Sequence, residues 1–402
     1  MKTFINTSKI YITLIFILIL TYAYQDFKSS TNIGLQEADR GMVHIMLFTV
    51  VVILSIYFLY TLFTKGIKRD SVKLNLWLIT VWILFVGIVQ GVSIWALLVH
   101  LGLSLLWILI YHFGKNYLIK YPSTQTTFLK WIIVIFLFYV YSAVFAAYNI
   151  SLIYGRKPVL NLVYYVIVFF PWISLLSSRR LKRVLNFLVL AIVLLSFKRG
   201  AIIIFPLMLI MYSLIKAKIE NTKIVGFGRS LVLVILFFCG LLVVDQFNGG
   251  FILNRFTLEA LASGSGRTDL YSLAINNVEK RSFGDLIIGL GSGSSVQFLG
   301  TGTHNEWIEF IFSFGIIGVT LYSKLFISLV IRGRSYIIEK SKYAPAYTSI
   351  IVYMLVIGLF GGLYFVHSTL YVMLFLGTIE GLRINEKKEM NNGEKNWNDN
   401  IS

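Results

Sequence analysis

Cysteine and charged residues are scarce in this 402-residue sequence, and each shortage excludes a class of protein. The single cysteine, Cys239, lies in an apolar run, which rules out a disulfide framework and a thiolate metal site. Charged residues make up 13% of the chain, about half of their share in an average soluble domain, whereas 57% of the residues are hydrophobic. So little polar surface cannot coat a water-soluble globule, and we expect lipid to be the main solvent.

Long unbroken apolar runs decide how the chain crosses that lipid. Backbone polar groups inside a bilayer must be satisfied within the protein, which leaves helices or closed barrels. Barrel strands alternate in polarity, and this chain does not alternate. The sequence therefore predicts an all-α integral membrane protein with about twelve transmembrane helices of roughly 20 residues each. The predicted spans are 10–24, 42–63, 74–90, 92–112, 130–150, 159–176, 184–197, 201–215, 230–246, 307–330, 346–361 and 367–382.

The basic residues predict the orientation. The net charge is +18, and the 36 Lys and Arg residues lie in short segments between apolar runs, so no nucleic-acid partner is expected. Placing both termini in the cytoplasm puts 25 of them in cytoplasmic segments and 10 outside, in line with the positive-inside rule. The first apolar run is interpreted as an uncleaved helix, because no small-residue cleavage site follows it. We thus expect a polytopic transmembrane domain over 1–385 and a flexible cytoplasmic tail over 386–402.

One polar segment differs from the other connections. Residues 247–306 form the only long polar stretch, and the charge pattern places this large loop outside the cytoplasm. Long loops of this kind are usually functional or disordered, and the many Gly, Leu, Ile and Phe residues argue against disorder. A capped helix is expected over 268–280, followed by a turn with Gly289, Gly291 and Gly293. The turn could bind phosphate through backbone donors, although a plain turn is the simpler interpretation.

Arginines on the predicted outer side are the first candidates for a functional site. Arg156, Arg199, Arg255 and Arg267 depart from the charge bias, and Arg199 lies between two apolar runs. A charge at such a depth is costly and commonly marks a site. The fixed fork of guanidinium donors suits a phosphate or a pyrophosphate. The alternative is a structural role, either by snorkelling or in an ion pair with Asp245, Asp269 or Glu309.

A histidine is the second candidate. His304 lies where the large outer loop returns to the membrane, and a histidine there can accept a proton from a hydroxyl near neutral pH. Its alternative role is to cap the next helix. No cluster of histidines and carboxylates in the sequence suggests a metal site, and no cofactor is expected.

Four short motifs carry a resemblance to a known family. His304-Asn305, nine residues and Gly315-Ile-Ile-Gly318 resemble a pattern of the O-antigen ligase/polymerase superfamily, which includes Wzy-type polysaccharide repeat-unit polymerases. Ser265-Gly266-Arg267, Gly289-Leu-Gly291-Ser-Gly293 and Ser196-Phe-Lys-Arg199-Gly200-Ala201 are similar to three further motifs of that family, with Lys198 where a serine is usual. The resemblance covers roughly residues 185–320, and the first half of the chain shares only its hydropathy.

The resemblance implies a GT-C-like polytopic glycosyltransferase in the bacterial cytoplasmic (inner) membrane. The expected donor is an oligosaccharide on undecaprenyl pyrophosphate, and the acceptor is a sugar hydroxyl of another lipid-linked repeat unit of O-antigen or capsule. Further partners implied are membrane lipid and the chain-length regulator and flippase of the same pathway. His304 would be the catalytic base, with Arg199 and Arg267 at the pyrophosphate. Substrate-binding candidates are Arg255, Arg156, Asn305 and Glu309.

Two alternatives stay open at this point. An O-antigen ligase, which transfers the glycan to lipid A-core, shares the same motifs. A transporter or flippase of lipid-linked oligosaccharide would place charges near the membrane midplane and often has repeated halves. The charged candidates gather instead in one outer loop, and no repeat is evident, which argues against a transporter. The sequence does not separate polymerase from ligase, and the polymerase is favoured as the more frequent class.

Overall fold

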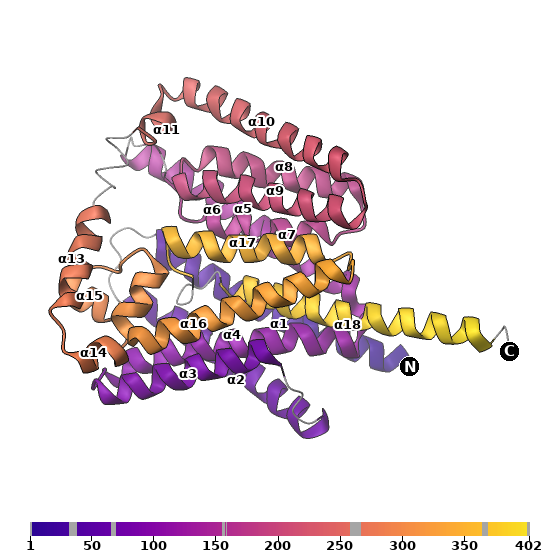
Figure 1. Cartoon of the computed structure of the whole chain (residues 1–402), viewed down its shortest axis with the longest axis horizontal. Coiled ribbons are helices and arrows are strands. Elements are labelled where there is room, and N and C mark those ends of the chain that lie inside the picture. Colours follow the sequence, from indigo (N-terminus) through magenta and orange to yellow (C-terminus); the bar gives the residue numbers. More distant parts are fainter. Residues whose placement is uncertain are drawn as a thin grey trace. The chain divides into compact units, whose positions relative to one another are not determined.

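The computed structural model describes residues 2–31, 38–65, 70–154, 157, 159–257, 267–363 and 369–399, and no strand occurs within these ranges (Figure 1). The longer helices are α1 (Lys2–Thr31), α2 (Ala38–Lys65), α3 (Ser71–Val89), α4 (Ile94–Lys120), α5 (Gln125–Tyr154), α8 (Arg179–Leu195), α9 (Arg199–Ile219), α10 (Lys223–Phe247), α13 (Arg267–Glu279), α16 (Glu306–Ile338), α17 (Ala344–Phe360) and α18 (Thr369–Asp399). The short ones are η1 (Pro122–Thr124), α6 (Val163–Ile167), α7 (Phe170–Ser174), α11 (Phe251–Asn254), α14 (Phe283–Ile288) and α15 (Ser294–Leu299).

The helices have the character of a multi-pass membrane protein. Among the described residues, six helices are long and apolar enough to cross a membrane, namely Gly41–Thr64, Ser71–Val89, Ile94–Lys120, Pro122–Leu152, Arg199–Ile219 and Glu306–Ile338. Shorter apolar helices cover Lys9–Gln25, Val163–Ser174, Leu231–Phe247 and Ala344–Phe360. The prediction of a helical membrane protein is confirmed at this level.

Two regions differ from the sequence-based expectation. The range 159–176, expected to be one span, contains the separate helices α6 and α7. Pro171 lies in the first turn of α7, and because proline has no N–H it cannot donate to the carbonyl of Ile167. The series of backbone hydrogen bonds is therefore interrupted between α6 and α7. Near the carboxyl terminus, α18 continues to Asp399, into residues that were expected to form a flexible tail.

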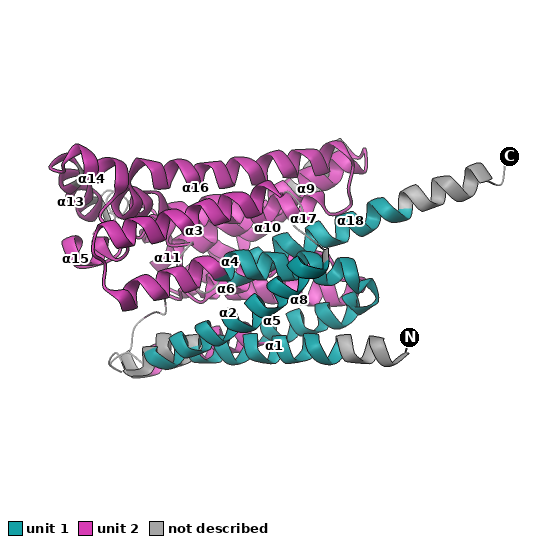
Figure 2. Ribbon diagram, turned by 90° about the horizontal axis from the view of Figure 1, so that it is seen from below, with its two compact units in different colours: residues 1–68, 106–137, 370–402 teal, residues 69–105, 138–369 magenta. Residues whose placement is uncertain are grey.

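The chain forms two compact units, which Figure 2 shows in teal and magenta. Unit 1 comprises residues 1–68, 106–137 and 370–402, and unit 2 comprises residues 69–105 and 138–369. Both units are discontinuous in sequence, so each depends on contacts between distant segments.

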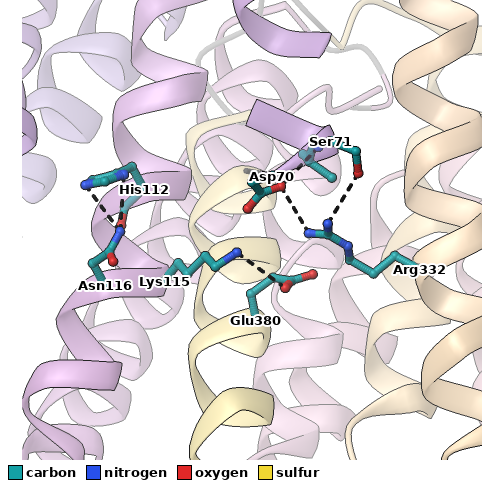
Figure 3. Close-up of polar contacts among 8 residues, drawn as sticks. Asp70, Ser71, His112, Lys115, Asn116, Arg332 and Glu380 are labelled. Carbon is teal, nitrogen blue, oxygen red and sulfur yellow. Dashed lines mark hydrogen bonds and ion pairs between the residues drawn. The ribbon is translucent and has the colours of Figure 1, made fainter. Parts of the chain in front are cut away.

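Close backbone packing joins α4 and α18 within unit 1. Gly114 on α4 and Gly377 and Gly381 on α18 have so little room that an added Cβ would lie less than 3.0 Å from the facing backbone. Small residues at a crossing let two helices approach and pack tightly in a membrane. Lys115 and Glu380 form an ion pair at 3.7 Å next to this contact (Figure 3).

In unit 2, α16 packs against α3, α14 and α17, and α9 packs against α10 and α17. The carboxylate of Asp70 caps α3 by accepting from the backbone N–H of Val72 at 3.1 Å. The same carboxylate accepts from Arg332 of α16 at 3.3 Å, and a second nitrogen of Arg332 donates to Ser71 (Figure 3). One arginine thus connects the start of α3 to the last third of α16.

Candidate functional site

One end of unit 2 collects the residues of interest. The helices α11, α13, α14 and α15 lie towards the same end in Figure 1. Gln90, which follows α3, donates to the carbonyl of Gly289 at 2.7 Å and so connects α3 to the turn after α14. Asp245 near the end of α10 accepts from the backbone N–H groups of Ile252 and Leu253 at 2.5 and 3.2 Å, which caps α11. Hydrogen bonds therefore connect α11 and the turn after α14 to the ends of the long helices α10 and α3.

Arg199 and Arg255 meet at this end and form what we call the arginine pair. Nη1 of Arg199, the first residue of α9, donates to the carbonyl oxygen of Arg255 at 2.9 Å. Nη1 of Arg255, which follows α11, donates to the carbonyl oxygen of Phe197 at 2.6 Å. Each guanidinium is thus bonded to the backbone beside the other arginine, and two like charges from distant segments lie together.

The surroundings of the arginine pair add positive charge. Burial, followed by the neighbouring guanidinium of Arg199, lowers the pKa of Arg255 below its usual value, although arginine stays protonated in proteins. Lys157 donates to the carbonyl of Asn248, and its Nζ lies 5.1 Å from the centre of the Phe251 ring. The amino-terminal end of α9 contributes a further partial positive charge through the helix dipole. Such a concentration of positive charge favours an anionic ligand.

The expected acidic partners of Arg199 have other roles. Asp245 caps α11, Glu309 bonds to hydroxyl and backbone groups described below, and Asp269 is exposed. The structural alternative for Arg199 stays open beside the functional one.

His304 does not cap the following helix. Its side chain is exposed, and its backbone has a φ of +52°, in the left-handed region that few residues other than glycine adopt. The cap is Asn305, whose side-chain oxygen accepts from the N–H groups of Trp307 and Ile308 at 3.0 and 3.2 Å. The capping alternative for His304 is thus excluded, and the amide oxygen of Asn305, a predicted substrate-binding residue, is bonded to the helix start.

Two carboxylates in the first turn of α16 are bonded within the protein. Glu306 is buried and accepts from the backbone N–H of Leu363 at 2.6 Å. Glu309 accepts from the hydroxyl of Ser295 at 2.6 Å and from the backbone N–H of Thr303 at 3.2 Å. Negative charge at this position suits the amino-terminal end of a helix.

The glycine-rich turn packs on a kink in α16. Gly315 interrupts that helix with φ 64° and ψ −168°, so the carbonyls of the preceding turn are available to other donors. Leu290 and Gly291 donate to two of these carbonyls, at 3.2 and 2.8 Å. An added Cβ on Gly315 would lie 2.7 Å from the nitrogen of Gly289. The backbone donors of Leu290 and Gly291 are used within the fold, which favours the plain-turn interpretation over a phosphate cradle.

The end of α17 separates the arginine pair from the His304 loop. An added Cβ on Gly200, which follows Arg199, would lie 3.4 Å from Cβ of Phe360. The preceding residue, Leu359, accepts a long contact from the amide of Asn305 at 3.5 Å. Leu359 and Phe360 at the end of α17 therefore lie next to the neighbours of His304 and Arg199, respectively.

Arg156, and the side chain of Arg267 at the start of α13, lie outside the described residues. Sequence reasoning overlooked the polar groups around Glu309, namely Ser295, Thr303 and Ser313. Ser313 stands at helical spacing from Glu309, whereas no spacing in the sequence indicates Ser295 and Thr303.

The arginine pair concentrates positive charge, and the end of α17 contacts neighbours of both Arg199 and His304. In the described part of the chain, no three His, Cys, Asp or Glu side chains form a group that could bind a metal ion. The chain matches no protein-family model, and no curated protein shows significant sequence similarity to it.

Proposed function

We propose that the protein is a glycosyltransferase of the membrane that polymerises surface-polysaccharide repeat units. The donor is a glycan on undecaprenyl pyrophosphate, and the acceptor is a sugar hydroxyl of another lipid-linked repeat unit. The observation that carries the proposal is the arginine pair, in which two guanidinium groups from distant segments lie together, while the end of α17 contacts neighbours of both Arg199 and His304. The motifs that resemble the O-antigen ligase/polymerase superfamily supply the identity of the substrates.

The arginine pair would bind the pyrophosphate of the donor. A guanidinium has five N–H donors, and Arg255 uses Nη1 on the carbonyl of Phe197, so further donors remain for a ligand. Two guanidinium groups can neutralise the charge that develops on the pyrophosphate as the anomeric bond breaks. Arg267 remains a predicted third contact. The pyrophosphate is a good leaving group, so the reaction demands neither a general acid nor a metal.

His304 would act as the general base. The acceptor oxygen attacks the anomeric carbon, its proton passes to the imidazole of His304, and the bond from the anomeric carbon to the pyrophosphate oxygen breaks. Direct displacement inverts the configuration at the anomeric carbon. The exposed side chain of His304 is accessible to an acceptor sugar from the outer solution.

The proposed topology follows the distribution of charge. Twelve crossings with both termini in the cytoplasm would put residues 247–306 on the outer face of the cytoplasmic membrane. The 25 Lys and Arg residues in the proposed cytoplasmic segments, against 10 outside, support this orientation. The arginine pair and His304 would then face the lipid-linked donor after it has crossed the membrane.

Reconstitution with lipid-linked repeat units tests the function. The protein is purified, mixed with the repeat units in vesicles, and the glycans are separated by length on a gel. A ladder of lengths supports the polymerase. Transfer to added lipid A-core would identify a ligase instead, and the absence of any covalent product would indicate transport and refute the proposal.

Variants of the arginine pair test the site. Arg199→Lys and Arg255→Lys keep the charge but lose the forked donors, and a hydrogen bond to a charged group contributes about 1.5–3 kcal/mol, or about 10- to 100-fold in turnover. Arg334→Lys is the matched control, because Arg334 is exposed on the last turns of α16, towards its proposed cytoplasmic end. Full activity of both site variants would exclude a pyrophosphate site at the arginine pair.

A further inference from the structure

Glu309 lies at the centre of a hydrogen-bond network behind the His304 loop. Its Oε1 accepts from the hydroxyl groups of Ser295 at 2.6 Å and Ser313 at 3.2 Å. Its Oε2 lies 3.2 Å from the backbone nitrogen and 3.1 Å from the hydroxyl of Thr303. An ionised carboxylate has about four lone-pair sites. Donors of the protein can fill three of them, and the single hydroxyl proton of Thr303 serves either Glu309 or the carbonyl of Asn305. Glu309 is thus bonded mainly within the protein.

The residue that this network constrains is His304. A left-handed backbone conformation costs a non-glycine residue roughly 1–2 kcal/mol, so His304 adopts it only where its neighbours are fixed. On one side, Thr303 is fully buried, and its hydroxyl contacts both Glu309 and the carbonyl oxygen of Asn305, the latter at 2.8 Å. On the other side, Asn305 caps α16. Because both neighbours are bonded to the rest of the protein, the backbone of His304 is restricted to its left-handed conformation.

The backbone N–H of Thr303 donates to the carboxylate of Glu309. Thr303 is buried, so its N–H would lose a hydrogen bond without access to water if Glu309 were removed, a situation that costs about 1–3 kcal/mol. That cost is comparable with the cost of the left-handed conformation itself. Loss of the carboxylate therefore lets the loop relax, and the imidazole moves with it.

We propose that Glu309 is a positioning residue, which holds His304 in its left-handed conformation through Thr303 and thereby aims the imidazole at the acceptor. The catalytic consequence rests on the proposed function, whereas the constraint on the loop does not. Glu309 is thus assigned a role through His304 and not a contact with the substrate.

Kinetics of Glu309 variants test the catalytic consequence. A displacement of a catalytic group by about 1 Å can cost about 100-fold in rate, so Glu309→Ala is expected to lower kcat by about 10- to 100-fold while KM for the donor changes little. Glu309→Gln keeps the volume and one acceptor oxygen, and we expect an intermediate loss, which serves if the alanine variant does not fold. Glu220→Ala, which removes an exposed carboxylate at the end of α9, is the control and keeps full activity.

A double variant shows whether the effect passes through His304. If Glu309 acts by positioning the imidazole, Glu309→Ala adds at most about a twofold loss once His304 is alanine, because coupled residues are not additive. A full additional loss in that background would overturn the proposal. An unchanged kcat in both Glu309 variants would overturn it as well.

Amide hydrogen exchange tests the constraint independently of activity. Exchange at Thr303 is expected to accelerate about tenfold or more in Glu309→Ala, since the N–H loses its acceptor, and to stay slow in Ser295→Ala, which alters only the other carboxylate oxygen. Unchanged exchange at Thr303 in Glu309→Ala would refute the constraint. A wild-type protein that transfers no glycan would refute the proposed function instead, and accelerated exchange would still support the constraint.

Discussion

The contact between Gly289 and Gly315 provides the sharpest stability prediction. Gly315→Ala combines two costs. Its backbone, at φ 64° and ψ −168°, lies in a region that only glycine occupies readily, and an alanine there costs about 1–3 kcal/mol. The new Cβ would also lie 2.7 Å from the nitrogen of Gly289, with the carbonyl of Ile287 closer still. Overpacking against backbone costs a further 1–3 kcal/mol or so, and we expect a total of about 2–6 kcal/mol.

Two other glycines near α15 separate these costs. Gly293 has a φ of +82° but open space around its missing Cβ, so Gly293→Ala tests the conformational cost alone, about 1–2 kcal/mol. Gly302 has open space and no positive φ, so Gly302→Ala is expected to be neutral or slightly stabilising. The order of stability is then Gly302→Ala, Gly293→Ala and, lowest, Gly315→Ala.

Thermal unfolding of the detergent-solubilised protein measures this series. The fraction of monodisperse protein that remains after heating gives an apparent midpoint for each variant. Equal midpoints for Gly315→Ala and Gly302→Ala would show that α16 has no kink at Gly315 and no close contact with the glycine turn. Equal midpoints for Gly315→Ala and Gly293→Ala would show that the backbone contact with Gly289 adds nothing.

Three further predictions concern stability, orientation and metal. Arg332→Ala removes the guanidinium bonded to the buried side chain of Asp70, and we expect a loss of about 1–3 kcal/mol in the same unfolding assay; an unchanged midpoint would mean that this ion pair does not join α3 to α16. Gln297 is exposed on α15, so Gln297→Cys in a Cys239→Ser background is expected to react with an impermeant thiol reagent added to intact cells. An outer membrane, if there is one, is permeabilised first. Protection of this cysteine from the reagent would reverse the proposed orientation. Glycan transfer is expected to persist in EDTA, and loss of turnover that added divalent metal restores would contradict the metal-independent mechanism.

Some parts of the site could be found by reading along the chain. Arg199 was a candidate because a charge between two apolar runs has no local reason to be there, and His304 because it precedes a predicted span. A proline at 171 inside a predicted span was also a readable signal, and it explains why α6 and α7 are separate helices. Such signals are local, since each depends on a residue type and on its immediate neighbours.

Other parts depended on segments that are distant in sequence. Nothing near Arg255 indicates that its backbone meets Arg199, or that Arg255 contacts Phe197. Glu309 was predicted to bind substrate, yet Ser295, Thr303 and Ser313 supply its contacts. Apart from Ser313, these partners were not predictable because hydroxyl and amide groups are common, and only the path of the chain determines which of them meet.

The sequence by itself determined the solvent and the helical class of the fold. A chain with so few charges cannot be coated by water, and a backbone in lipid must satisfy its own hydrogen bonds, which leaves helices wherever the apolar runs are long. The tertiary structure alone decided which charges lie together and which carboxylate fixes the His304 loop. The physical reason is that apolar patterning acts within one helix, whereas hydrogen bonds between loops need donors and acceptors within about 3 Å of each other, and only the packing of distant helix ends brings them that close.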